Sequence, residues 1–254
     1  MPVASVDGAD IYFEDSDPSG SLPALIFCHG AAGNTVSWWQ QIAFFRSSWR
    51  CISYDIRGYG RTPNPTGDSM GHLISDLEAL VQHLGLSTCC LVAQSMGGRA
   101  ALGFATRHPQ KVRALVMADN WGNFDWPEQV ARAKEFSIPA GHPGGVGRRF
   151  AQDQPSLHFL WQSLKGLNPP RPPLAGCTPG GPTLDQVRQL PVPVLCIVGE
   201  DDVIFHPPLI RAFAELLPSS EYVEVEGAGH SVYFEKADTF NKLIQDFLQR
   251  AAES

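Results

Sequence analysis

Short runs rich in β-branched and aromatic residues alternate with helical patterns along most of this chain, and this alternation limits its fold most strongly. The candidate strands are Val3–Val6, Ile11–Glu14, Ala24–Cys28, Cys51–Asp55, Cys89–Gln94, Val112–Asp119, Val192–Gly199 and Glu221–Glu226. The candidate helices are Ser37–Arg46, Ser69–Leu84, Met96–His108, Pro208–Leu217 and Ser231–Ala251. Such alternation is typical of a mostly parallel sheet with helices on both faces. The sequence therefore predicts an α/β fold around an eight-stranded sheet.

Two local features refine this prediction. Asp7-Gly8 separates the first two candidate strands and is a turn pair of β-hairpins, so we expect an antiparallel hairpin at the edge of the sheet. The run Ala24–Cys28 is apolar throughout, as in central strands that are buried on both faces. A chain of 254 residues commonly forms one α/β unit. We therefore expect a single domain over residues 1–254.

The alternation lapses between about Trp121 and Leu190. This stretch is first rich in aromatic residues and then in proline and glycine, through Asn168-Pro-Pro-Arg-Pro-Pro. Long irregular insertions between two strands of one sheet are often lids or binding loops. We therefore expect a cap inserted over about residues 121–190, covering a largely apolar pocket. Trp126 and Trp161 are the candidate pocket residues.

Composition excludes several classes of function. The formal net charge is −7 and no basic run is present, which argues against a nucleic-acid partner. No apolar run is long enough to cross a bilayer, and the N-terminus shows no basic and apolar signal pattern, so the sequence predicts a cytoplasmic protein without a membrane partner. The six cysteines are scattered and are expected to be reduced core thiols, with no metal site. The oligomeric state stays open.

The segment Leu91-Val-Ala-Gln-Ser95-Met-Gly-Gly carries the strongest chemical signal. A buried strand leads into Ser95 and a helix leaves it, a turn that strains the serine backbone and lifts the hydroxyl above the sheet. Strand and helix nearly touch there, which requires small residues at Ala93 and Gly97. Glycine is usual at the first of these positions, and Ala93 adds one methyl group. Alone, the segment also fits an ordinary serine near a helix N-terminus.

Three further segments lie just after predicted strands. Cys28-His29-Gly30-Ala31 follows the third strand, where a backbone N–H could join that of Met96 in holding an oxyanion. Asp202 follows the seventh strand, and His230 lies in a Gly-rich loop after the eighth. The chain order of Ser95, Asp202 and His230 is that of nucleophile, acid and base on parallel sheets of this kind. His29 itself is expected to be structural.

These segments resemble the α/β-hydrolase superfamily over nearly the whole chain. The resemblance implies a triad of Ser95 as nucleophile, His230 as general base and Asp202 as the acid that orients it. It also implies that the N–H groups of Ala31 and Met96 form the oxyanion hole. Asp202 fits the superfamily spacing Gly-x-x-Asp from Gly199, while Asp201 and Asp119 stay open as alternative acids.

The resemblance implies a serine hydrolase that cleaves a carboxylic ester or related acyl substrate and needs neither metal nor organic cofactor. A first alternative is carbon–carbon chemistry, because Ser95-Met-Gly-Gly-Arg99 also resembles menaquinone-pathway enzymes that eliminate pyruvate; carbon–carbon bond hydrolases share the architecture. Arg99 lies on the predicted helix that follows Ser95 and is expected to be a surface or salt-bridging residue. A second alternative is a ligand-binding, receptor-like protein on the same fold. The substrate is a small molecule in each case.

Overall fold

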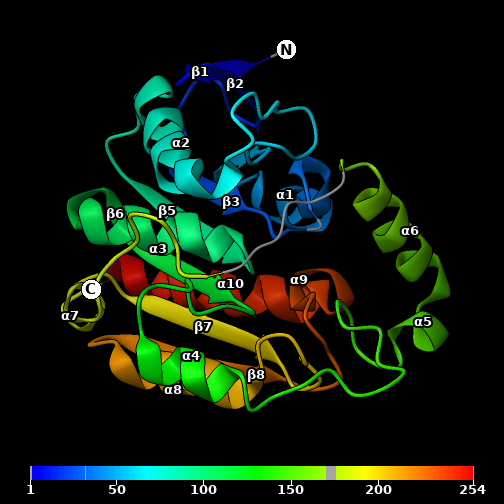
Figure 1. Cartoon of the computed structure of the whole chain (residues 1–254). Helices are drawn as coiled ribbons and strands as arrows, with labels where there is room; N and C mark the ends of the chain where they lie inside the picture. The colour runs from blue at the N-terminus through cyan, green and yellow to red at the C-terminus, as the bar shows by residue number, and fades with distance from the viewer. Residues whose placement is uncertain (1, 32, 170–175, 254) are drawn as a thin grey trace.

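The computed structural model describes residues 2–31, 33–169 and 176–253, and these contain one eight-stranded sheet (Figure 1). Its spatial order is β1-β2-β4-β3-β5-β6-β7-β8. The strands are β1 (Val3–Val6), β2 (Ala9–Asp15), β3 (Ala24–Cys28), β4 (Arg50–Tyr54), β5 (Cys89–Gln94), β6 (Val112–Ala118), β7 (Val194–Gly199) and β8 (Ser220–Val225). β2 is antiparallel to both of its neighbours, β1 at the edge and β4, and β3 to β8 are parallel to one another. The predicted mostly parallel sheet is confirmed.

Helices connect the strands where the sequence predicts them, and two expected helices are broken. The helices outside the β6–β7 connection are η1 (Thr35–Trp38), α1 (Trp39–Phe45), α2 (Ser69–His83), α3 (Gly97–Arg107), η2 (Pro109–Lys111), α8 (Pro207–Leu216), α9 (Val232–Glu235) and α10 (Ala237–Glu253). The expected helix Ser37–Arg46 is split between η1 and α1. The expected helix Ser231–Ala251 is interrupted at Lys236, whose φ of −131° and ψ of 52° are not helical. No helix within the described ranges is long and apolar enough to cross a membrane.

Side chains that alternate along the strands build an apolar core on each face of the sheet. In β5, Leu91 and Ala93 point into one core, and Cys90 and Val92 point into the other. The first core lies against α2, α3 and α8, and the second lies against α1, α9 and α10. Two covered faces explain why the central strands are apolar throughout.

Residues 119–193, here called the insertion, connect β6 to β7. The insertion contains α4 (Pro127–Ala133), α5 (Phe150–Asp153), α6 (Pro155–Gly166) and α7 (Leu184–Arg188), so the stretch where the alternation lapses is partly helical. Proline at the start of α4 and α6 fits the first helical turn, where a missing N–H costs nothing. In Figure 1 α4 lies over α8, and α6 stands at the opposite side beyond α9. Most of the proline run after Asn168 lies outside the described residues.

Candidate active site

Ser95 lies at the turn between β5 and α3 in a strained backbone conformation. Its φ is 49°, in the left-handed region that side chains rarely adopt, at a cost of about 1–3 kcal/mol. The Ser95 N–H donates to the carbonyl of Ala118 at 3.0 Å. A Cβ on Gly97 would lie 2.2 Å from the carbonyl oxygen of Cys28, so only glycine allows this close approach. The sequence expectation of a tight strand–Ser–helix turn therefore has a steric basis.

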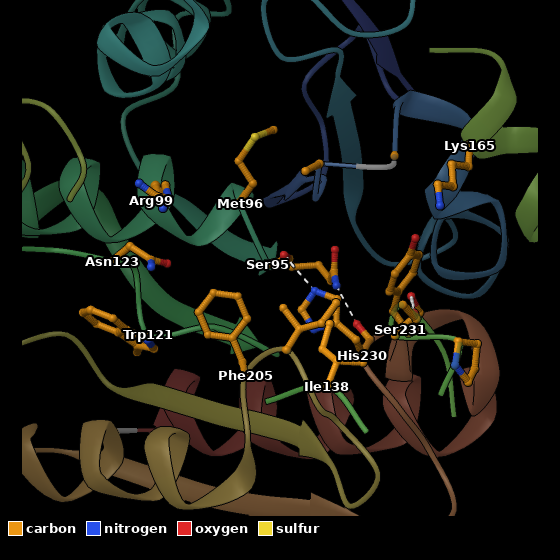
Figure 2. Close-up of a pocket in the computed structure, with 18 of the residues that line it drawn as sticks. Ser95, Met96, Arg99, Trp121, Asn123, Ile138, Lys165, Phe205, His230 and Ser231 are labelled. Atoms are coloured by element: carbon orange, nitrogen blue, oxygen red, sulfur yellow. Dashed lines mark hydrogen bonds between the residues drawn. The ribbon is translucent and has the colours of Figure 1, made fainter. Parts of the chain in front are cut away.

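His230 lies between Ser95 and Asp202, and Figure 2 shows its contact with Ser95. Its Nε2 is 2.9 Å from Ser95 Oγ, and its Nδ1 is 2.9 Å from Asp202 Oδ2. Asp202 is buried, and its Oδ1 accepts the N–H groups of Ile204 at 2.8 Å and Phe205 at 3.0 Å. These backbone donors fix the carboxylate, so that its second oxygen faces the imidazole. The three side chains that the sequence singles out are brought together in one chain of hydrogen bonds.

Asp201 points away from this chain. Its Oδ2 accepts the N–H of Arg148 at 2.6 Å and lies 3.1 Å from His142 Nε2. Arg148 and His142 both belong to the insertion, so Asp201 ties the end of β7 to the insertion and does not contact His230.

Asp119 is fully buried behind the site. It accepts the N–H of Gly199 at 3.2 Å and that of Val232 at 3.4 Å. Burial, followed by the charge of Asp202, raises the pKa of Asp119 well above its ordinary value. Asp119 therefore braces two loops, and Asp202 is the acid that contacts His230.

The loop after β3 packs against the serine turn. A Cβ on Gly30 would lie 3.0 Å from the Cβ of Ser95. Ala31 and Met96 both line the pocket beside Ser95, and within the described part of the chain neither backbone N–H has a hydrogen-bond acceptor. Two N–H groups without acceptors next to a serine hydroxyl form a setting in which an oxyanion could be held.

His29 supports this loop from below. Its Nε2 accepts the N–H of Ile56 at 2.9 Å, and its Nδ1 lies 2.7 Å from the carbonyl oxygen of Gly30. Burial lowers the pKa of His29, which favours a neutral ring that can make both contacts. The expected structural role of His29 is confirmed by its position.

A cavity of about 530 Å³ opens beside Ser95. The loops at the strand ends and the elements that follow them contribute Ala31, Gly33, Gln94, Ser95, Met96, Arg99, Ile204, Phe205, Leu209, His230, Ser231 and Tyr233. The insertion contributes Trp121, Asn123, Ala133, Ile138, Pro143, Gly144, Gly145, Trp161 and Lys165. The wall is mainly apolar, with Arg99 near one end and Lys165 near the other (Figure 2).

The two candidate tryptophans lie in different places. Trp161 lines the pocket, and its indole N–H donates to Ser231 Oγ at 3.2 Å. Trp126 is absent from the pocket lining that the described residues form. Its ring stacks on that of Phe124, with centroids 5.8 Å apart, and packs against the core. The expectation for Trp126 is corrected, because its ring turns inward just before α4. Trp121 faces the cavity instead.

Arg99 also departs from expectation. It is 5% exposed and lines the cavity, and its Nη1 donates to the carbonyl of Gly176 at 3.0 Å. No carboxylate of the described residues lies within 4.0 Å of its guanidinium. Burial lowers the pKa of Arg99. The expected surface or salt-bridging arginine is therefore a buried cation in the pocket wall.

Two residues near His230 carry no sequence signal. The side-chain amide of Gln94 donates to the carbonyl of His230 at 2.7 Å, and Phe205 stacks on the imidazole with centroids 5.7 Å apart. Gln94 is the last residue of β5 and Phe205 lies in the loop after β7, yet only the folded arrangement shows what they touch. Among the described side chains, no group of three or more His, Cys, Asp or Glu is placed to hold a metal ion.

Comparison with known families agrees with this geometry. Residues 23–159 match the model of the alpha/beta hydrolase fold. The chain belongs to this family. Residues 177–253 in addition match a model described as TAP-like protein. The first match covers more than half of the chain.

Relatives of several activities cover nearly the full chain. A putative 2-succinyl-6-hydroxy-2,4-cyclohexadiene-1-carboxylate synthase of Bacillus subtilis is 29% identical and covers 95% of this chain and 96% of its own. A bifunctional esterase/perhydrolase of Acinetobacter calcoaceticus is 25% identical, with 97% and 99% covered. The solved structure of a thermophilic esterase from Thermogutta terrifontis is 24% identical, covers 98% and 97%, and superposes with a TM-score of 0.79. These proteins share the fold with this chain and differ among themselves in chemistry.

Proposed function

We propose that this protein is a serine hydrolase that cleaves a carboxylic ester or a related acyl substrate through an acyl-enzyme. The observation that carries this proposal is the hydrogen-bonded series Ser95 Oγ, His230 and Asp202, with both contacts of His230 at 2.9 Å. A nucleophile, a base and an orienting acid in this order are the requirements for serine-based acyl transfer. The catalytic roles of these residues are assigned on that basis.

In the proposed reaction, Ser95 Oγ attacks the ester carbonyl while its proton passes to His230 Nε2. The negative charge that develops on the carbonyl oxygen is stabilised by the N–H groups of Ala31 and Met96, each worth about 10²–10³ in rate in comparable sites. The C–O bond then breaks, and the alcohol leaves with the proton from His230. A water molecule, activated by His230, cleaves the acyl-enzyme to a carboxylic acid and free Ser95. Each step uses only this chain and water.

Asp202 contributes by holding the imidazole. Its carboxylate accepts the Nδ1–H of His230, which leaves Nε2 unprotonated and facing the serine. The same carboxylate stabilises the imidazolium that forms during attack. Because two backbone N–H groups fix Asp202, little rearrangement is needed when charge moves.

We propose that the insertion acts as the cap of a single domain and selects the acyl group. It supplies Ile138 and Trp161 to the apolar wall opposite the strand ends. A cavity of about 530 Å³ suits a small or medium acyl or aryl group. The relative from Acinetobacter calcoaceticus, named an esterase and perhydrolase, supports ester chemistry in this family.

The direct test is a panel of 4-nitrophenyl esters from acetate to decanoate, combined with labelling by a fluorophosphonate. We expect multiple turnovers on the shorter esters and one phosphonyl group on Ser95. Labelling without turnover would instead support the receptor-like alternative, in which the same residues line a binding pocket.

One observation favours a second candidate, a substrate that carries a carboxylate. Arg99 is a buried cation in the pocket without a carboxylate partner among the described residues, so an anionic substrate group would compensate its desolvation. The Bacillus subtilis relative is named for a product with a carboxylate and a succinyl group. Carbon–carbon bond cleavage or elimination by the same three residues is consistent with such a substrate.

Replacing Arg99 by methionine tests this candidate. For the 4-nitrophenyl monoester of succinate, kcat/KM should fall about tenfold or more, while 4-nitrophenyl acetate should change little. Arg107→Met is the matched control, because Arg107 lies on the same helix, is exposed and pairs with Glu78. An equal loss on both esters in Arg99→Met would exclude a role in recognising a carboxylate.

A further inference from the structure

Glu235 holds the backbone on both sides of His230. It is the last residue of α9 and is 6% exposed. Its Oε1 accepts the N–H of Gly229 at 3.1 Å and that of Ser231 at 3.2 Å. These two donors are the residues immediately before and after His230. The break between α9 and α10 ends the helix at Glu235, one short turn after the histidine loop.

The second oxygen of the same carboxylate reaches the insertion. Glu235 Oε2 accepts the N–H of Gly147 at 2.8 Å. The two chain segments touch here, since a Cβ on Gly229 would lie 2.2 Å from the nitrogen of Gly147. The carboxylate thus has three backbone donors from two segments more than 80 residues apart in sequence.

A second contact runs parallel to this one. Ser231 Oγ donates to the carbonyl of Gly145 at 2.7 Å and accepts the indole N–H of Trp161 at 3.2 Å. Residues of the insertion that line the pocket are therefore bonded directly to the residue after His230. Together, these contacts connect the backbone on both sides of His230 to the insertion.

We propose that Glu235 is a positioning residue for His230, linking the base to the insertion so that the imidazole is aligned with Ser95 only when the insertion is docked. This inference rests on the proposed function, because alignment matters only if His230 takes the serine proton. The alternative is a structural brace that affects stability alone. The Glu235 carboxyl touches no reacting atom and acts through the loop.

Glutamine is the informative substitution, since it keeps the shape and changes the donors. A carboxylate can accept on both oxygens, whereas an amide accepts on one side and donates on the other. In Glu235→Gln either Gly147 or the pair Gly229 and Ser231 must face an N–H₂ group. Glu200→Gln is the matched control, because Glu200 accepts the N–H of Gly227 in the same loop and is exposed.

The variants are compared by kcat and KM on a 4-nitrophenyl ester, with active sites counted by fluorophosphonate titration. A misalignment of about 1 Å can cost on the order of 10² in rate, so we expect kcat per titrated site to fall about 10- to 100-fold in Glu235→Gln with KM nearly unchanged. Glu200→Gln should behave as wild type. Wild-type kcat per titrated site in Glu235→Gln would overturn the proposal and leave only a structural brace.

Hydrogen exchange provides a readout that does not depend on turnover. The amides of Gly147, Gly229 and Ser231 should exchange faster in Glu235→Gln, while amides of the central strands should not. If the wild type hydrolyses no ester, the proposed function fails, and the exchange result still reports whether Glu235 links the loop to the insertion. Unchanged exchange at all three amides would overturn the link itself.

Discussion

The ends of the parallel strands and the insertion form the two walls of one pocket, and they are built differently. At the strand ends, Ser95, Asp202 and His230 follow β5, β7 and β8, and backbone contacts hold each of them. The insertion is made of short helices that pack on α8 at one end and beside α9 at the other. The strand ends thus provide fixed positions, while the insertion provides a surface whose shape depends on docking.

This difference suggests that the strand ends determine the rate of the reaction and the insertion determines which substrate binds. Side chains fixed by strands suit steps in which atoms must meet within tenths of an ångström, and a docked surface suits the selection of a substrate. Changes at the strand ends should therefore alter kcat, and changes to pocket-lining side chains of the insertion that leave the contact of Glu235 with Gly147 in place should mainly alter the preference among substrates. The following experiments test that separation.

The largest effect is expected from Ser95→Ala. If Ser95 is the nucleophile, as proposed, its removal eliminates the covalent route, so kcat should fall by roughly 10⁴–10⁶ with the melting temperature preserved. Ser163→Ala on the exposed face of α6 serves as the control in the insertion. A folded Ser95→Ala protein that keeps a tenth of wild-type kcat would show that another group performs the attack.

The next largest differences in kcat are expected among Asn variants of the three aspartates near β6 and β7. Asp202→Asn should lower kcat by up to about 10⁴, the loss seen when a serine protease loses its orienting acid. Asp201→Asn should cost far less, because Asp201 contacts the insertion. Asp119→Asn should also cost less, since it braces backbone groups. Assayed side by side, a larger loss in Asp119→Asn than in Asp202→Asn would reassign the acid.

The two tryptophans of the insertion should show opposite effects. Trp126→Ala removes core packing against Phe124 and should lower the free energy of unfolding by about 3 kcal/mol, with the preference for acyl chain length unchanged. Trp161→Ala opens the pocket wall and should shift that preference by about tenfold, a change worth about 1.4 kcal/mol. Both variants are compared by denaturant unfolding and by kcat/KM on esters of increasing acyl chain length. A large shift in acyl-chain preference in Trp126→Ala alone would show that Trp126, and not Trp161, contacts the acyl group.

An effect on stability, measured apart from the proposed chemistry, is expected in the pH dependence of unfolding. Burial, opposed by its three backbone donors, raises the pKa of Glu235 from 4.5 to about 7. Between these values the folded protein keeps a proton that the unfolded chain has lost, so stability falls as pH rises from 4.5 to 7. The contribution of Glu235 to this fall is roughly 3 kcal/mol. Unfolding free energies at pH 5 and 8 should therefore differ less in Glu235→Gln; an identical difference would show that Glu235 titrates normally.

Much of the fold follows from local patterns in the sequence. The strands predicted from apolar runs lie within two residues of their observed ends, because burial on both faces leaves a clear composition. Helix breaks were not predicted. Nothing local interrupts the pattern between Ser231 and Ala251, and the break at Lys236 places the Glu235 carboxylate among donors from distant segments.

The candidate site also has residues that the sequence could predict and residues that it could not. Ser95, Asp202 and His230 could be selected as candidates because each follows a strand, in an order typical of the fold, and the structure brings their side chains together. In the insertion, no predicted strand marks which side chains face the pocket. Whether Trp126 or Trp121 faces the cavity depends on the docking of α4 on α8, and the burial of Arg99 depends on the carbonyl of Gly176, 77 residues away. Contacts between segments this distant leave no periodic signal in one sequence.

The central claim is that Ser95 carries the acyl group during turnover. The most direct measurement quenches the enzyme in acid while it hydrolyses 4-nitrophenyl acetate and maps the acetylated peptide by mass spectrometry. The account predicts acetylation of Ser95 alone, which disappears once the substrate is consumed. Steady hydrolysis with no acetyl group on Ser95, even when deacetylation is slowed in Asp202→Asn, would contradict it.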